Sequence, residues 1–318
     1  MSDPAASQTA GAAAAPGALR RWFDSDLVWS LRHSPVAIGA GIVAFVFLFG
    51  AASATWLAPH DPFDLASLEL MDALTPPAWF PEGRSTYLLG TDDQGRDVFS
   101  SILHGSRISI AVGFASVLVA MVLGVVLGLI AGYAGGAVDA FIMRVADVQL
   151  SFPAILIALL IDGVARVVLP DAAQGGHALL VLVIAIGLSG WVQYARTVRG
   201  STMVERRKEY VQAARVIGRH PLAIMLFHVL PNVLGPVLVI ATIHLATAII
   251  TEATLSFLGV GMPITTPSLG TLIRIGNDFL FSGEWWITVF PGAALVLLVL
   301  SVNLLGDWLR DALNPRLH

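Results

Sequence analysis

The chain has 318 residues and no cysteine, which excludes disulfides, thiolate metal ligands and cysteine nucleophiles. Residues of apolar type make up 56% of it and charged residues 13%, against roughly 25% charged residues in a typical globular protein. Together with a mean hydropathy of +0.78 this composition indicates an integral membrane protein, and the net charge of −4 gives no indication of a nucleic-acid partner.

A disordered cytoplasmic tail is predicted for residues 1–33, because the stretch from Met1 to about Leu19 is rich in Ala, Ser, Pro and Gly without apolar periodicity. A first membrane span is predicted at Val36–Leu57. The alternative is a secretory signal, since Ala-Ser-Ala at 52–54 resembles a cleavage site. The apolar run is longer than the roughly 7–15 residues of a signal core. We therefore expect a retained span, followed by an extracytoplasmic loop that completes the segment 34–107.

Five further spans of roughly 20 residues each form a core predicted over residues 108–318. They are Ile108–Ala131, Phe141–Ile161, Leu179–Val198, Val229–Thr251 and Trp286–Leu305. The span at 141–161 carries Arg144, Asp147 and Gln149 in its first turns, and Pro153 is expected to kink it. The prediction is an all-α, polytopic membrane protein with six transmembrane helices.

Glycines recur along the second span and at its exit. Gly124, Gly128 and Gly132 are four residues apart, with Gly113 before them, and this spacing allows close helix crossing. The pair at 135–136 predicts a tight cytoplasmic turn.

The distribution of basic residues predicts the orientation. With the N-terminus inside, thirteen of the 18 Lys and Arg residues lie on the cytoplasmic side and five outside. This bias places both chain termini and the segment 209–232 in the cytoplasm.

A short polar helix is predicted between the fourth and fifth spans. Tyr210, Ala213, Ala214 and Ile217 recur at the i, i+3, i+4, i+7 spacing of one helix stripe, and Gly218 is expected to end the helix. A stripe of two alanines between larger side chains suits docking to a partner protein. The alternative is an amphipathic helix that rests on lipid headgroups.

This segment resembles the EAA loop of ABC-importer permeases, through Gln212-Ala213-Ala214, Gly218, position 228 and Leu230-Pro231. Gln212 stands where that family usually has Glu, and His228 where it usually has Ile. In the family the loop forms a coupling helix that sits in a groove of the ATPase subunit. The resemblance implies a coupling helix at about 204–220 and these coupling residues: Glu209, Tyr210, Ala213, Ala214, Ile217, Gly218, His228, Leu230, Pro231 and Asn232.

Segments 89–98, 255–261 and 306–315 resemble the C-type permease subunit of dipeptide/oligopeptide importers, and the resemblance runs from about Ser34 to the C-terminus. It implies the type I ABC importer permease fold in the cell (inner or plasma) membrane. It also implies a second related permease, two ABC ATPase subunits and an extracytoplasmic solute-binding protein as partners. The implied cargo is short peptides, and nickel or glutathione remain alternatives within the family.

An ATPase site of its own is excluded by the only lysine. Lys208 follows Arg207, so the chain cannot contain the Gly-Lys-Ser/Thr of a phosphate-binding loop. We therefore expect a transport subunit that is not an enzyme and carries no cofactor, with ATP bound by partner subunits.

An enzymatic alternative comes from Gly187-Leu188-Ser189-Gly190, which matches the Gly-x-Ser-Gly of rhomboid intramembrane proteases. His228 or His244 would then be the base. Four matching residues arise easily by chance in a glycine-rich membrane chain, and His244 reaches Ser189 only if their two helices pack face to face.

Four polar residues, His244, Glu252, Asn303 and Asp307, lie in or beside predicted spans, where such groups usually face the protein interior. For His244 and Asn303 we predict a place in the lining of the substrate path, with an interhelical hydrogen bond as the alternative. For Glu252 and Asp307 the preferred interpretation is a hydrogen bond between helices or an interfacial position. No His, Asp or Glu cluster has metal-ligand spacing, so no metal site is predicted.

Acidic residues also precede the second span. Asp92, Asp93 and Asp97 suggest calcium, but Gly95 and Arg96 interrupt the pattern of a twelve-residue calcium loop. The resemblance implies an ordered extracellular turn here, and Arg96 pairing with Asp92 or Asp97 accounts for it.

Overall fold

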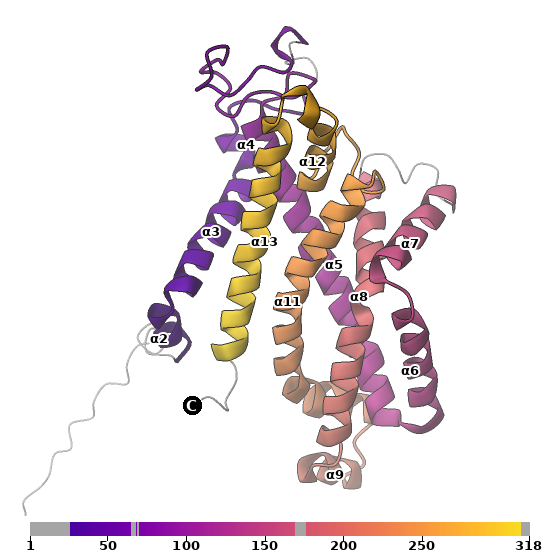
Figure 1. The fold of residues 1–318 in the computed structure, drawn as a ribbon. Helices are drawn as coiled ribbons and strands as arrows, with labels where there is room; N and C mark the ends of the chain where they lie inside the picture. Colours follow the sequence, from indigo (N-terminus) through magenta and orange to yellow (C-terminus); the bar gives the residue numbers. More distant parts are fainter. Residues whose placement is uncertain (1–25, 65–67, 69, 169–175, 313–318) are drawn as a thin grey trace, which may run out of the picture.

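The structure, a computed structural model, describes residues 26–64, 68, 70–168 and 176–312 (Figure 1). Most of the predicted tail 1–33 therefore lies outside the described residues. Its last part, Asp26–His33, forms the helix α2, where disorder was expected.

The regular structure of the described residues is helical, joined by loops of which the segment between α4 and α5 is the longest, and its one β feature is an isolated bridge between Thr91 and Asp97. The predicted all-α fold is thus confirmed. The helices after α2 are α3 (Pro35–Ala52), α4 (Ala54–Leu57), the 3-10 turn η1 (Leu70–Asp72), α5 (Val98–Ala134), α6 (Gly136–Leu150), α7 (Ala154–Val168), α8 (Gly176–Glu205), α9 (Glu209–Val216), α10 (Pro221–Ile224), the π turn η3 (Met225–Val229), α11 (Leu230–Phe257), α12 (Leu269–Asn277), the 3-10 turn η4 (Leu280–Ser282) and α13 (Trp286–Ala312).

Five described helices are long and apolar enough to span a membrane, at Pro35–Ala52, Val98–Ala134, His177–Glu205, Pro221–Phe257 and Trp286–Ala312. The pair α6 and α7 makes a sixth span if it is counted as one broken span, with a bend of 95° between its halves. In Figure 1, α5 and α8 both run toward the end that carries α9, so α6 and α7 together must bring the chain back between them. The predicted kink at Pro153 is therefore a full break.

The broken span is attached to the middle of α8 through Gln149. Its side-chain amide donates to the carbonyls of Leu188 and Ser189 at 2.8 and 3.1 Å. The indole of Trp191 donates to the Gln149 Oε1 at 2.6 Å. These bonds place the break beside the centre of a 30-residue helix.

The α5–α8 crossing depends on glycine, as the spacing predicts. A Cβ at Gly128 would lie 2.6 Å from the carbonyl oxygen of Ala195, and one at Gly132 would lie 2.8 Å from the carbonyl oxygen of Arg199. Gly124 is in similarly close contact with α8. After α5, Gly135 and Gly136 have φ values of 70° and 56°, which confirms the predicted tight turn.

Glu252 joins α5 and α11 at a fully buried position. It accepts hydrogen bonds from the hydroxyls of Ser109 on α5 and Ser256 on α11, both at 2.7 Å. Ser109 in turn accepts from the backbone N–H of Leu269 at the start of α12. The preferred interpretation of Glu252 as a hydrogen-bonded packing residue is confirmed. Asp307 is exposed on α13.

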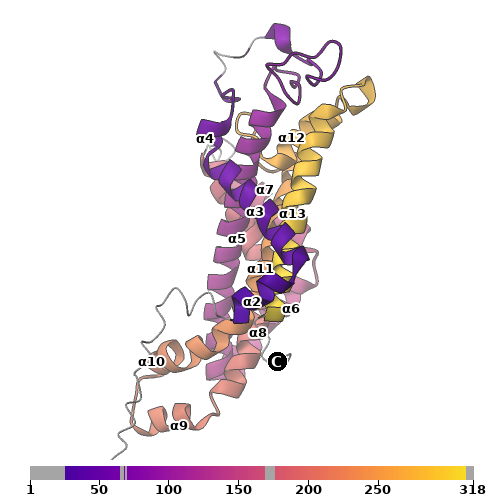
Figure 2. The ribbon, with the colours of Figure 1, turned by 90° about the vertical axis from the view of Figure 1, so that its left-hand side faces the viewer.

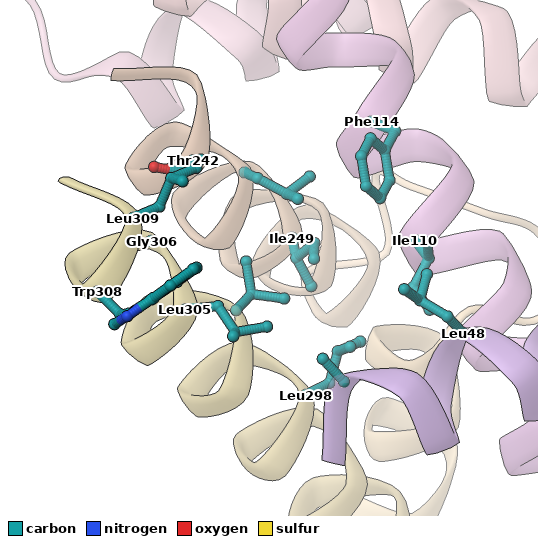
Figure 3. A pocket seen from close by; sticks show the side chains of 13 residues that line it. Leu48, Ile110, Phe114, Thr242, Ile249, Leu298, Leu305, Gly306, Trp308 and Leu309 are labelled. Carbon is teal, nitrogen blue, oxygen red and sulfur yellow. The ribbon is translucent and has the colours of Figure 1, made fainter. Parts of the chain in front are cut away.

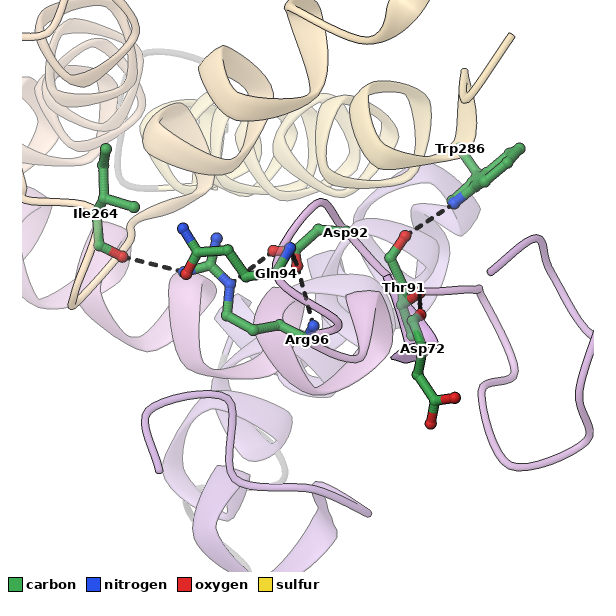
Figure 4. Close-up of polar contacts among 7 residues, drawn as sticks. All are labelled: Asp72, Thr91, Asp92, Gln94, Arg96, Ile264 and Trp286. Atoms are coloured by element: carbon green, nitrogen blue, oxygen red, sulfur yellow. Dashed lines mark hydrogen bonds and ion pairs between the residues drawn. The ribbon is translucent and has the colours of Figure 1, made fainter. Parts of the chain in front are cut away.

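The turn before α5 is ordered as expected, at the end of the molecule opposite α9. Arg96 donates from Nε to Asp92 Oδ2 at 2.6 Å and from Nη1 to the carbonyl of Ile264 at 3.1 Å (Figure 4). Asp97 accepts from the N–H of Ser100 at 2.9 Å and caps α5. This cap explains why α5 begins at Val98, ten residues before the predicted start of the span.

Candidate functional site

The predicted coupling segment forms a separate helix, α9, at one end of the molecule (Figure 2). It begins after Lys208 and has Glu209 in its first turn and Arg215 in its last, charges that suit the helix dipole. Gly218 follows with φ 80°, and the N–H of Arg219 donates to the carbonyl of Ala214 at 3.1 Å. This is the Schellman arrangement, so the predicted stop at Gly218 is confirmed.

The two faces of α9 differ from the predicted stripe. Val211 and Ala214 are buried, and they pack in an apolar cluster with residues of α5, α8, α10 and α11. Ala213 is exposed, and Val216 and Ile217 are 87% and 84% exposed. The prediction that Ala214 shares an exposed stripe with Ala213 and Ile217 is therefore wrong. The helix has apolar side chains on two sides, and the side with Val211 and Ala214 packs against the rest of the chain.

Tyr210 braces α9 internally. Its hydroxyl donates to Glu205 at the end of α8, and it accepts from the side-chain amide of Asn232 at 3.1 Å. Asn232 also donates to the carbonyl of His228 at 2.7 Å. The structure thus brings Tyr210, His228 and Asn232 together, but Tyr210 holds α8 and α11 rather than offering a free anchor to a partner.

The phenol of Tyr210 remains protonated in this brace. Burial, and then the neighbouring Glu205 carboxylate, raise the pKa of Tyr210 from 10.0 to about 12. A phenol with a raised pKa contributes its stabilisation fully below pH 10 and loses it as the pH rises toward 12. At neutral pH the hydroxyl therefore always has a proton to donate to Glu205.

A second set of contacts ties α9 to the end of α5. Arg206 Nη1 donates to the backbone carbonyl of Tyr133 at 3.0 Å, and the guanidinium of Arg215 lies 4.8 Å from the centre of the Tyr133 ring. Gln212 donates from its amide to the carbonyl of Arg206 at 3.0 Å. A glutamate at 212 lacks the N–H for this bond, which gives a local reason for glutamine there.

Leu230 and Pro231 shape the entry to α11. Leu230 packs against the apolar cluster beneath α9, and its N–H donates to the carbonyl of Met225 five residues back. Pro231 has no N–H for the carbonyl four residues before it, which accounts for a π turn at Met225–Val229.

Sequence reasoning missed two members of this site, Tyr133 and Glu205. Glu205 carried a signal, since it is the one acidic residue in the basic stretch from Arg196 to Lys208. Tyr133 carried none beyond its place beside the Gly135–Gly136 turn.

Replacing Tyr210 with phenylalanine is expected to weaken the link between α9 and the spans while leaving α9 folded. The variant loses the bonds to Glu205 and Asn232, and a hydrogen bond to a charged group is worth roughly 1.5–3 kcal/mol. In a transport complex of the kind that the resemblance implies, the measurement is the amount of solute moved per ATP hydrolysed, which should fall severalfold. Tyr87→Phe is the matched control, because it removes a tyrosine–carboxylate bond to Asp72 at the opposite end. Equal ratios for both variants and the wild type would contradict the brace.

His244 and Asn303 lie apart from α9. His244 is 8% exposed, and its Nδ1 is 3.0 Å from the hydroxyl of Tyr194 on α8. It lies so close to α8 that a Cβ at Gly190 would be 2.3 Å from its Cε1. The structure thus shows the interhelical hydrogen bond that was the alternative for His244, with the ring between two packed helices, and its place in the substrate path stays a prediction. Asn303 is half-buried on α13, and its predicted place in the path stays a prediction.

The protease arrangement is not formed. The Ser189 hydroxyl donates to the carbonyl of Ile186 in its own helix at 2.8 Å, whereas His244 pairs with Tyr194. His228 lies beside α9. Among the described residues, no three His, Asp or Glu side chains gather as metal ligands do.

An apolar pocket of about 310 Å³ lies between α3, α5, α11 and α13 (Figure 3). Leu48, Phe114, Leu298 and Leu305 contribute to its walls, and the hydroxyl of Thr242 is bonded to the carbonyl of Val239 in its own helix. Such a lining suits hydrocarbon or another apolar helix and offers a polar solute few hydrogen-bond partners.

Comparisons with known proteins identify relatives of the chain. Residues 124–318 match the model of a family described as binding-protein-dependent transport system inner membrane component. The di/tripeptide transport system permease protein DppC of Pseudomonas aeruginosa is 37% identical over 289 residues, which cover 91% of this chain and 90% of that protein. The dipeptide transport system permease protein DppC of Escherichia coli K12 is 41% identical over 287 residues, 90% of each chain.

Among solved structures, a chain of the MetNI methionine ABC transporter in an inward-facing conformation has a TM-score of 0.53 at 21% identity. The match covers 68% of this chain and 97% of that chain. At this level of identity it shows a common fold, that of an ABC importer permease, as the sequence resemblance implies.

Proposed function

The chain belongs to the family of binding-protein-dependent transport system inner membrane components and is a permease of an ABC importer, and from this premise we propose that its cargo is short peptides. The names of its relatives support this cargo, since those called di/tripeptide, dipeptide and D,D-dipeptide permeases are 33% to 41% identical to it. Each of these matches covers about nine-tenths of both chains. Nickel and glutathione stay as alternatives that an uptake assay separates.

The observation that supports the proposed mechanism is the structure of α9. This helix exposes apolar side chains on one side and is held to the spans by polar contacts on the other. Ala213, Val216 and Ile217 face outward, where a groove in an ATPase subunit could receive them. Behind them, the bonds of Tyr210 join α9 to α8 and α11, and Arg215 packs on Tyr133 of α5. In this proposal α9 moves as a rigid body when the ATPases close on ATP, and the three spans move with it. The partners bind ATP, and this chain binds none.

The orientation and assembly follow from the same proposal. The end with α9 faces the cytoplasm, where the basic residues are concentrated, and both termini lie on that side. The importer contains this chain, a second related permease, two ATPase subunits and an extracytoplasmic binding protein. A ligand changes the balance between the two conformational states of a transport cycle only if it binds them with different affinity. The binding protein and ATP must therefore each bind one state more tightly than the other.

Reconstitution of the transporter tests this function. Proteoliposomes with the full complex, ATP and the loaded binding protein are expected to accumulate a labelled dipeptide, whereas this chain alone should neither move it nor hydrolyse ATP. Unlabelled dipeptide should compete, and Ni²⁺ or glutathione should not. Uptake by the purified chain alone would refute the coupling proposal, and competition by Ni²⁺ or glutathione alone would change the cargo.

A further inference from the structure

A small pocket opens at the end of the molecule opposite α9, between the turn before α5 and the loop that joins α11 to α12. It has a volume of about 140 Å³ and is lined by Pro62, Phe63, Gln94, Arg96, Ile264 and Thr265. Arg96 is the one charged residue among these six, and Figure 4 shows its bond to the carbonyl of Ile264. The rim is accessible, since Ile264 is 41% exposed and Thr265 is exposed.

Arg96 is held rigidly, and one of its three side-chain nitrogens makes no hydrogen bond to the described residues. Its side chain is 3% exposed, Nε is bonded to Asp92 and Nη1 to the Ile264 carbonyl. Nη2 is buried and has no acceptor within the described ranges. Buried N–H groups are seldom left unbonded, and least of all on a charged group, because the lost hydration is not replaced. The pocket therefore presents a buried donor nitrogen that no described residue of this chain satisfies.

The charges around Arg96 indicate an uncharged acceptor. Both oxygens of Asp92 are already occupied, Oδ2 by Arg96 Nε and Oδ1 by the backbone N–H groups of Gln94 and Arg96. Asp93 is adjacent, and burial followed by the charge of Asp92 raises its pKa. A further carboxylate would meet both of these acids, whereas a carbonyl oxygen carries no net charge. Pro62, Phe63 and Ile264 provide apolar walls beside the free donor.

We propose that this Arg96 pocket receives a loop of the extracytoplasmic binding protein, which places a carbonyl oxygen on Arg96 Nη2 and an apolar side chain between Phe63 and Ile264. The inference rests on the proposed function, because the orientation given there puts this end outside the membrane. The pocket is lined by loop residues at the end of the molecule opposite α9 rather than by residues of the spans, and this location favours a docked protein over the cargo.

Affinity measurements on the assembled complex in lipid nanodiscs test this proposal. The probe is the binding protein of the same transport system, purified free of solute, and its Kd is measured for each permease variant. Thr265→Trp fills the pocket from its exposed rim and leaves Arg96 unsubstituted, and Arg96→Lys keeps the charge but removes Nη2. Both variants should weaken binding at least about tenfold, because Arg96→Lys removes the charged donor and Thr265→Trp blocks access to it. Thr86→Trp, at an exposed position of the same end outside the pocket, should bind within about twofold of the wild type.

The possible results separate the pocket from the proposed function. Unchanged affinity for both pocket variants would overturn the inference. Unchanged affinity with slower dipeptide uptake would also overturn it, in favour of a site for cargo. If the wild-type complex holds its ATPases but does not bind the binding protein at all, the proposed function fails together with the pocket.

Discussion

Ala213→Trp is expected to abolish solute uptake and to release the ATPase subunits, while the permease remains folded in the membrane. Ala213 is exposed on the outer face of α9 beside Val216 and Ile217, so a large side chain there meets the partner and not this chain. A well-packed interface loses roughly 1–3 kcal/mol or more when it is overpacked. The measurement is the ATPase content of the purified complex together with ATP-driven uptake in proteoliposomes.

The neighbouring alanine is the sharpest control. Ala214 is 6% exposed and packs against the apolar cluster beneath α9, so Ala214→Trp should lower the thermal stability and yield of the permease itself. Ala137→Trp, at an exposed alanine in the first turn of α6, should do neither. If Ala213→Trp and Ala214→Trp damage folding equally, or if Ala213→Trp transports normally, the proposed docking face is wrong.

Gly128→Ala is expected to destabilise the α5–α8 pair by about 1–3 kcal/mol although alanine is the better helix former. Its new Cβ would lie 2.6 Å from the carbonyl oxygen of Ala195 and 2.8 Å from the Cβ of Val198, contacts that only a shift of the helices can relieve. Gly128→Leu should prevent the crossing altogether. The apparent melting temperature of the detergent-solubilised permease measures the effect.

Gly200→Ala makes the same chemical change on α8 where no atom lies within 4 Å of the added Cβ. It should be neutral, or stabilising by about 0.5–1 kcal/mol, because alanine loses less conformational entropy in a helix than glycine does. Equal effects of Gly128→Ala and Gly200→Ala would show that the close crossing contributes little to stability.

Much of this fold could be predicted because it depends on local signals. Apolar runs predict the spans, four-residue glycine spacing predicts the close crossing at Gly128, and Gly218 marks the end of α9. The early start of α5 also had a local signal, since Asp97 is a good N-cap residue. The 95° break near Pro153 could be predicted only in part, because a proline indicates where a helix is kinked but not by what angle.

The site was harder to predict, because contacts between distant residues decide it. Tyr210 and Asn232 are 22 residues apart, and helix periodicity says nothing of their meeting. Periodicity also could not show which apolar side of α9 packs against its own chain, the one with Val211 and Ala214 or the one with Ala213 and Ile217. For His244 the deciding fact was a neighbour, Tyr194, on another helix.

The corner between α6 and α7 limits what can surround the subunit. Residues 151–153 are exposed there, and the bonds of Gln149 place them level with the midpoint of α8, at the depth of the acyl chains. Hydrocarbon cannot solvate peptide groups that leave a helix, so a lipid-facing corner at this depth would be unstable. On this side the neighbour has to be another protein surface or a column of water, and a single isolated copy in a bilayer has neither unless the membrane deforms.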